Sequence, residues 1–169
     1  LNMADYFRNN NMSFTPVGYE TSTQTRECFE GGVCDVLTSD KSQLSALSTE
    51  MKVGPEGVMI VPETISKEPL GPVVRQGDDQ WMDIVAMTLY ALINAEELGI
   101  TSGNIDKLKA NPGNPNVARL VGTEGNMGEL LGLGADWSYN AIKQVGNYGE
   151  IYERTVAKIG IPRAGSVND

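Results

Sequence analysis

Apolar and polar positions follow two alternating patterns along residues 1–62. Apolar side chains at helical spacing predict helices, and short apolar or alternating runs bounded by turn residues predict strands. The expected helices cover residues 3–8, 21–29 and 41–47, and the expected strands cover residues 13–20, 33–38 and 58–61. This regular alternation of helix and strand predicts a parallel α/β layer.

The pattern changes after residue 62. Beyond it we expect a polar connector, a short strand and a long helix, at 65–70, 71–75 and 80–98 respectively. The long helix has a wide apolar face, which predicts that Trp81 and Met82 are buried in a core. Farther on, glycine-rich turns separate short expected helices at 105–110, 115–121, 137–145 and 150–158.

Composition and charge exclude several classes of function. The chain has 169 residues and a formal net charge of −9, whereas nucleic-acid binding requires clustered positive charge. It contains no histidine, the commonest general base and metal ligand. A Rossmann or P-loop glycine pattern is absent, and so is a nucleophile with its base. We therefore expect no enzyme activity, no metal, no cofactor and no nucleic-acid partner.

The two cysteines, Cys28 and Cys34, are too few for a zinc or iron–sulfur site. They could form a local disulfide, pair with a cysteine of another chain, or remain two small buried side chains. The sequence leaves these alternatives open.

The ends of the chain bear on its completeness. No apolar run approaches the ~18 residues of a membrane span. The first residues lack the layout of a secretion signal, and Leu1 falls inside an expected helix. We therefore expect the chain to be part of a longer protein.

Asp40 is the candidate functional residue. It follows the expected strand at 33–38, and ligands of parallel α/β sheets bind beyond the carboxyl ends of the strands. Its carboxylate could cap the helix at 41–47, with Gln43 completing a capping box, or it could bind the ammonium group of a ligand. Asp35, within the same expected strand, is interpreted as structural.

Several stretches resemble a known family: 4–17, 31–44, 65–85, 90–101 and 142–156, among which SKEPLGPVVRQGDDQW and QVGNYGEIYER are long enough to be specific. They resemble the general L-amino-acid-binding periplasmic proteins of bacterial ABC importers, which belong to the type II periplasmic binding protein class. The resemblance implies an α/β fold of two lobes, joined by two crossover strands, that close on a free L-amino acid. It also implies that Asp40 forms a salt bridge with the α-ammonium group of that amino acid.

The resemblance further implies which parts of the family's fold are present. Residues 1–62 would be the remainder of lobe two, 63–98 the return through the hinge to lobe one, and 99–169 a helical C-terminal extension. The signal peptide, most of lobe one with its carboxylate-binding arginine, and a Gly-Thr-rich loop would precede Leu1. The family also continues beyond the element at Pro162 and Arg163. Arg75 does not match the carboxylate-binding arginine and is not assigned that role.

The implied partners follow from this incomplete fold. They are a free amino acid, the permease subunits of the importer, and either the missing N-terminal half or further copies of the chain, which would cover the apolar face of the helix at 80–98. Two alternatives come from other classes of function. One is an enzyme on the same bilobal fold, such as a small-acid dehydratase, and the other is a ligand-sensing domain.

Overall fold

The computed structural model describes residues 2–67, 69–166 and 168. These residues form two compact units. The first unit takes in residues up to 70 together with 159–162, and the second takes in residues 71–158 and those from 163 onward. Glu68, in the connector expected at 65–70, lies outside the described residues.

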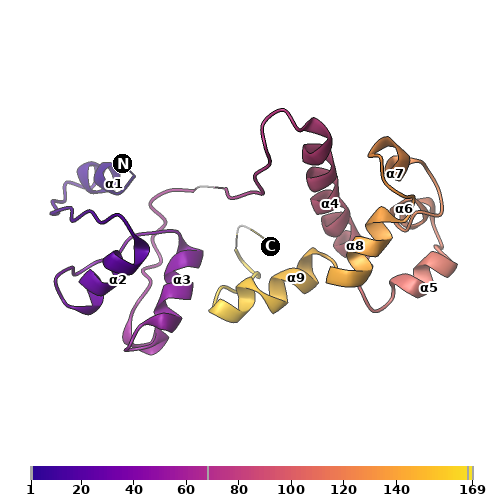
Figure 1. Ribbon diagram of the computed structural model, residues 1–169. Helices are drawn as coiled ribbons and strands as arrows, with labels where there is room; N and C mark the ends of the chain where they lie inside the picture. Colours follow the sequence, from indigo (N-terminus) through magenta and orange to yellow (C-terminus); the bar gives the residue numbers. More distant parts are fainter. Residues whose placement is uncertain (1, 68, 167, 169) are drawn as a thin grey trace. The chain divides into compact units, whose positions relative to one another are not determined.

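The first unit contains short helices joined by extended segments (Figure 1). They are α1 (Asn2–Asn9), α2 (Ser22–Glu30), α3 (Lys41–Glu50) and the 3-10 turn η1 (Pro55–Gly57). A capping box begins α2, because the Thr21 side chain accepts a hydrogen bond from the Gln24 N–H and the Gln24 side chain accepts one from the Thr21 N–H. The three helices expected from the sequence in this region are thus confirmed.

The helices α2 and α3 are neighbours that run in the same direction, because their N-terminal ends line one hollow and the last residue of α2 bonds to the residue after the C-cap of α3. Arg26, in the middle of α2, forms an ion pair with Glu50, the last residue of α3, with 2.6 Å between Nη1 and Oε2. The Glu30 carboxylate accepts a hydrogen bond from the Lys52 N–H at 2.7 Å. The N-terminal ends of both helices line one shallow hollow. Two parallel neighbouring helices are the arrangement that consecutive β–α units produce.

No strand forms among the described residues, so the strands expected at 13–20, 33–38, 58–61 and 71–75 are not observed. A strand exists only where its N–H and C=O groups pair with those of a neighbouring strand. Several of the apolar side chains that the sequence assigned to a buried sheet are instead exposed, with Val36 72%, Met59 82% and Val73 95% accessible. The described segments do not pair with one another.

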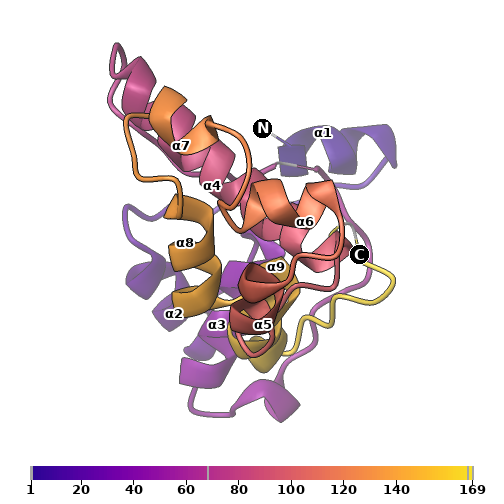
Figure 2. The same ribbon diagram turned by 90° about the vertical axis from the view of Figure 1, so that its right-hand side faces the viewer.

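The second unit is built from helices around one core (Figures 1 and 2). They are α4 (Asp79–Glu97), α5 (Ile105–Ala110), α6 (Pro115–Leu120), α7 (Met127–Leu130), α8 (Trp137–Val145), α9 (Tyr148–Arg154) and the 3-10 turn η2 (Val156–Ile159). Most were expected from the sequence, although α7 was not, and the helix expected at 150–158 is divided between α9 and η2.

The core of the second unit gathers against the C-terminal half of α4, where α8 and α9 pack on it. Its buried members are Leu92, Ala95, Ile100, Ile105, Val117, Val121 and Ile142. The prediction that Trp81 and Met82 belong to a core is wrong, because they are 52% and 50% exposed. These two residues lie in the first turn of α4, which precedes the part of the helix that the core covers.

Glycines in the α6–α8 region permit very close backbone contacts. A Cβ atom at Gly122 would lie 2.1 Å from the Ala135 carbonyl oxygen, and one at Gly128 would lie 2.2 Å from that of Gly134. No larger residue fits at either position without displacing the facing backbone. The close packing of the backbone in this region therefore requires glycine at these two positions. None of the helices described here is both long and apolar enough to cross a membrane.

Candidate functional site

Asp40 occupies the N-cap position of α3 and is exposed to solvent. Its carbonyl oxygen accepts the first hydrogen bond of the helix, from the Leu44 N–H at 2.9 Å. Its carboxylate, however, makes no capping hydrogen bond, so the predicted capping box with Gln43 is wrong. The Gln43 side chain instead accepts a hydrogen bond from the Ser39 hydroxyl. Gln43, which the sequence predicted as the capping-box partner of Asp40, is therefore bonded to Ser39.

The Asp40 carboxylate consequently remains able to accept hydrogen bonds from a ligand. Within the described part of the chain it takes part in no hydrogen bond and no ion pair. The side chains of Ser39 and Gln43, which flank Asp40 in the sequence, bond to each other and not to its carboxylate. An exposed carboxylate at a helix start, with no partner of its own, is an available acceptor for a cationic group.

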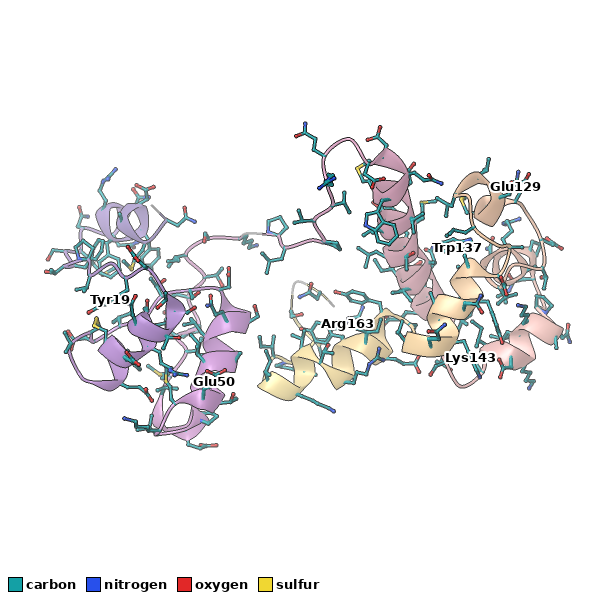
Figure 3. The ribbon with its side chains drawn as sticks, viewed as in Figure 1. Tyr19, Glu50, Glu129, Trp137, Lys143 and Arg163 are labelled. Atoms are coloured by element: carbon teal, nitrogen blue, oxygen red, sulfur yellow. A yellow bond between two sulfur atoms is a disulfide. The ribbon has the colours of Figure 1, made fainter. Side chains whose placement is uncertain are left out.

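A shallow hollow of about 230 Å³ lies between the N-terminal ends of α2 and α3. It is lined by Tyr19, Glu20, Thr21, Ser22, Thr25, Leu37, Thr38, Ser39, Gln43 and Leu47. Hydroxyl and amide groups dominate this lining, and such groups can both donate and accept hydrogen bonds. Figure 3 labels Tyr19, which precedes α2. Asp40 directly follows Ser39 of this lining but is not part of it.

Cys28 and Cys34 form a disulfide, with 5.5 Å between their Cα atoms. The structure thereby selects one of the alternatives that the sequence left open. The disulfide joins α2 to the segment that leads into Asp40 and α3. A local disulfide of this kind is typical of proteins that fold in an oxidising compartment.

A second cluster of polar side chains joins α5 to α8 in the other unit. Asp106 accepts hydrogen bonds from Lys143 at 2.6 Å and from the Tyr139 hydroxyl at 2.9 Å, and Figure 3 labels Lys143 on α8. These bonds, Lys143 first, hold the pKa of Asp106 below its ordinary value of 3.8. The Lys109 ammonium lies 3.7 Å from the centre of the Tyr139 ring. Each charge has a partner within the cluster. The cluster therefore holds α5 against α8 and, among its described residues, offers no free group for a ligand.

Sequence reasoning did not identify this cluster. A signal was present, since Tyr139 and Lys143 are four residues apart and share one face of a helix. Their partner Asp106 is distant in sequence, however, and only the packing of α5 on α8 brings it within reach. Among the residues described, no group of acidic or cysteine side chains is arranged to hold a metal ion.

Known proteins similar to this chain are amino-acid-binding components of transporters. The chain is 54% identical over 156 residues to the putative amino-acid ABC transporter-binding protein YhdW of Escherichia coli, covering 92% of this chain and 46% of YhdW. It is 52% identical over 160 residues to the general L-amino acid-binding periplasmic protein AapJ of Rhizobium johnstonii, covering 94% of this chain and 46% of AapJ.

The three-dimensional comparison agrees with this result. A solved ABC transporter periplasmic binding protein from Brucella ovis, with glutathione bound, is 44% identical and has a TM-score of 0.89. The match covers 96% of this chain and 51% of that structure. The chain is homologous to one half of an amino-acid ABC transporter binding protein.

The homology explains why the fold of this chain is incomplete. The chain traces part of a periplasmic binding protein fold, and it spans about half the length of the curated relatives it matches. No protein-family model matches it. The resemblance found in the sequence is confirmed, while the role of Asp40 remains a prediction.

Proposed function

We propose that this chain is part of an extracytoplasmic solute-binding component that captures free L-amino acids for an ABC importer and catalyses no reaction. The observation that carries the proposal is the 52% identity to the general L-amino acid-binding periplasmic protein AapJ over 94% of the chain. The similar periplasmic binding protein from Brucella ovis, whose structure has glutathione bound, supports the same class of binding protein.

Asp40 is proposed to bind the α-ammonium group of the amino acid. Its support is the exposed carboxylate at the start of α3, which caps nothing and pairs with nothing in the described chain. An ammonium group donates charge-assisted hydrogen bonds to such a carboxylate, and these strengthen when a closing cleft excludes water. The neighbouring hydroxyl-rich hollow offers further hydrogen-bonding groups for a polar ligand.

The lobe assignment belongs to the same proposal. Residues 1–62 form the remainder of an α/β lobe two, 63–98 return to lobe one, and 99–169 form a C-terminal extension. The expected strands at 33–38 and 58–61 become strands when neighbouring strands from the other half of a longer protein pair with them. The exposure of Val36 and Met59 supports this, because both are apolar side chains of the kind that a sheet buries.

The proposed setting is the periplasm, and the proposed partners are the permease subunits of the importer. The similarity to AapJ, a periplasmic protein, supports this, as does the Cys28–Cys34 disulfide, since disulfides persist in oxidising compartments. The remaining half of a longer protein, or a second copy of the chain, is the proposed cover for the exposed apolar segments.

The test uses a chimera in which this chain replaces the matching half of AapJ. Isothermal titration with L-amino acids is compared for the unchanged chimera, for Asp40→Ala, and for Asp35→Ala as a matched control. Asp35 is also exposed and lies five residues earlier in the same segment. Loss of the ammonium partner should weaken binding by roughly 100- to 10,000-fold. Asp35→Ala should leave the affinity unchanged.

Two results would contradict the proposal. A folded chimera that binds no amino acid would overturn the binding function itself. Equal affinities of Asp40→Ala and Asp35→Ala would overturn the role of Asp40 while leaving the binding function in place. A thermal melt of each variant shows whether it is folded.

A further inference from the structure

The Cys28–Cys34 disulfide lies at the start of the segment that carries Asp40. Cys28 is buried in α2, and its carbonyl oxygen accepts hydrogen bonds from the Val33 N–H at 3.0 Å and the Cys34 N–H at 3.2 Å. Gly32, with a φ of 69°, makes the tight reversal between the two cysteines. Cys34 is thus held to α2 by its backbone and by a covalent bond.

The segment 35–39, by contrast, has no backbone support of its own. Among the residues described, its N–H groups donate no hydrogen bond and its carbonyl oxygens accept none from the backbone. Its hydrogen bonds and covalent links to the rest of the described chain lie at its two ends, at Cys34 and at the Ser39–Gln43 hydrogen bond at the start of α3. Because only residues 35–39 separate Cys34 from Asp40, the position of Cys34 limits how far Asp40 can lie from α2.

The disulfide is also the covalent member of a closed ring of contacts. The ring runs from α2 through Cys34 and the segment 35–39 into α3, and returns to α2 through the Arg26–Glu50 ion pair. The ion pair is formed by side chains near the surface and is weak in water. Without the disulfide, α2 and the segment that leads to Asp40 are joined by the hydrogen bonds from the Val33 and Cys34 N–H groups to Cys28, and no covalent bond outside the backbone connects them.

We propose that the Cys28–Cys34 disulfide is a positioning element for Asp40, and that amino-acid affinity depends on it. This inference rests on the proposed function, because it assumes that Asp40 contacts the ligand. The disulfide itself is not proposed to touch the ligand. It restricts where the Asp40 carboxylate can be, so that less conformational freedom is lost on binding.

A double-mutant cycle distinguishes positioning from a general structural role. In the AapJ chimera, Cys28→Ala with Cys34→Ala should weaken amino-acid binding about tenfold. In an Asp40→Asn background the same pair of changes should weaken binding less than about twofold, because the group being positioned is no longer the ammonium partner. In an Asp35→Asn background, the matched control, the full tenfold loss should return.

The titrations are made well below the melting temperature of each variant. If the alanine pair does not fold, unchanged chimera reduced by dithiothreitol takes its place. That reagent becomes a cyclic disulfide and leaves both cysteines as thiols, which alkylation and mass spectrometry detect. A first alkylation of the untreated chain, without reductant, should leave both cysteines unmodified, and modification of either would contradict the disulfide itself.

Each outcome decides one claim. An equal loss in the Asp40→Asn and unchanged backgrounds would overturn positioning, since the disulfide would then act on the fold as a whole. No loss in any background would overturn it as well. If the unchanged chimera binds no amino acid, both the proposed function and this inference are overturned. The titration of the unchanged chimera therefore separates a failure of the proposed function from a failure of the inference alone.

Discussion

Glu150 accepts two hydrogen bonds from Ser102, from the backbone N–H to Oε2 at 3.0 Å and from the hydroxyl to Oε1 at 2.7 Å. The same carboxylate accepts the Asn147 N–H at 2.9 Å, and the Asn147 side chain accepts the Glu150 N–H in return, which makes a capping box at the start of α9. The Asn147 amide also donates to the Ile100 carbonyl at 2.8 Å. The start of α9 is thereby joined to the loop that follows α4.

Replacement of Glu150 by Gln should destabilise the second unit. The amide loses the charge and the hydrogen-bond geometry of the carboxylate, which should cost about 1–2 kcal/mol. Chemical denaturation followed by circular dichroism measures the loss. Glu153→Gln is the matched control, because Glu153 is an exposed residue of the same helix, and its melting curve should match that of the unchanged chain.

The effect of Glu150 should depend on pH. Partial burial by itself raises the pKa of Glu150, but the hydrogen bonds from Asn147 and Ser102 outweigh it and bring the pKa below the ordinary value of 4.5. A carboxyl with a lowered folded pKa stabilises the fold above its unfolded pKa and stops doing so as the pH falls through the folded pKa. The melting-temperature difference between the unchanged chain and Glu150→Gln should be full at pH 7 and shrink below about pH 4. A difference that grows on acidification would contradict this assignment.

Gly128→Ala should destabilise the α7–α8 region. The new methyl group would lie 2.2 Å from the Gly134 carbonyl oxygen and 3.0 Å from Cδ1 of Trp137, so backbone must move. Overpacking of this kind costs about 1–3 kcal/mol. Gly103→Ala is the control, because its methyl group would meet only the Thr101 hydroxyl at 3.8 Å. Equal melting temperatures for the two variants would show that α7 and the 134–137 turn are not packed as described.

Lys143→Met should raise the pKa of Asp106. The hydrogen bond from Lys143 is the largest cause of the lowered Asp106 pKa, and the hydrogen bond from Tyr139 is the next. Removing the ammonium should return the carboxyl toward its ordinary value of 3.8, which carbon-detected NMR titration measures. Lys107→Met, which removes a neighbouring charge from α5, should leave the titration of Asp106 unchanged. An identical midpoint in both variants would exclude the ion pair in solution.

Hydrogen exchange should separate the unpaired segments from the core. In the isolated chain the amides of 35–38 and 58–61 should exchange rapidly, because they form no strand there. In the AapJ chimera the same amides should slow by about a hundredfold or more, as sheet partners are supplied. Ile142, fully buried in the second unit, provides an amide that should be slow in both samples. Unchanged rapid exchange at 35–38 in the chimera would overturn the proposed strand pairing.

Local signals in the sequence predicted the helices well. The Thr21–Gln24 capping box, the acidic residues before α4 and the apolar spacing of α8 all act within a few residues, so their meaning does not depend on distant parts of the chain. The strand predictions were not confirmed for the opposite reason. A strand at 33–38 needs hydrogen-bonding neighbours from elsewhere, and no local pattern supplies them.

The candidate site was predictable only in part. The position of Asp40 at a helix start followed from the sequence, but its lack of a capping bond did not, because Ser39 competes for Gln43 in a way that depends on backbone direction. Burial of Trp81 was predicted wrongly since an apolar stripe shows what a helix can bury and does not show what packs on it.

Val33, Val36, Met59 and Val73 give this chain a property that its buried core does not determine. Bare segments rich in β-branched and apolar residues recruit one another into intermolecular sheets, so unaccompanied copies are prone to aggregate. Strand partners for these segments should therefore raise the solubility of the chain, because they remove the unpaired edges on which aggregation begins.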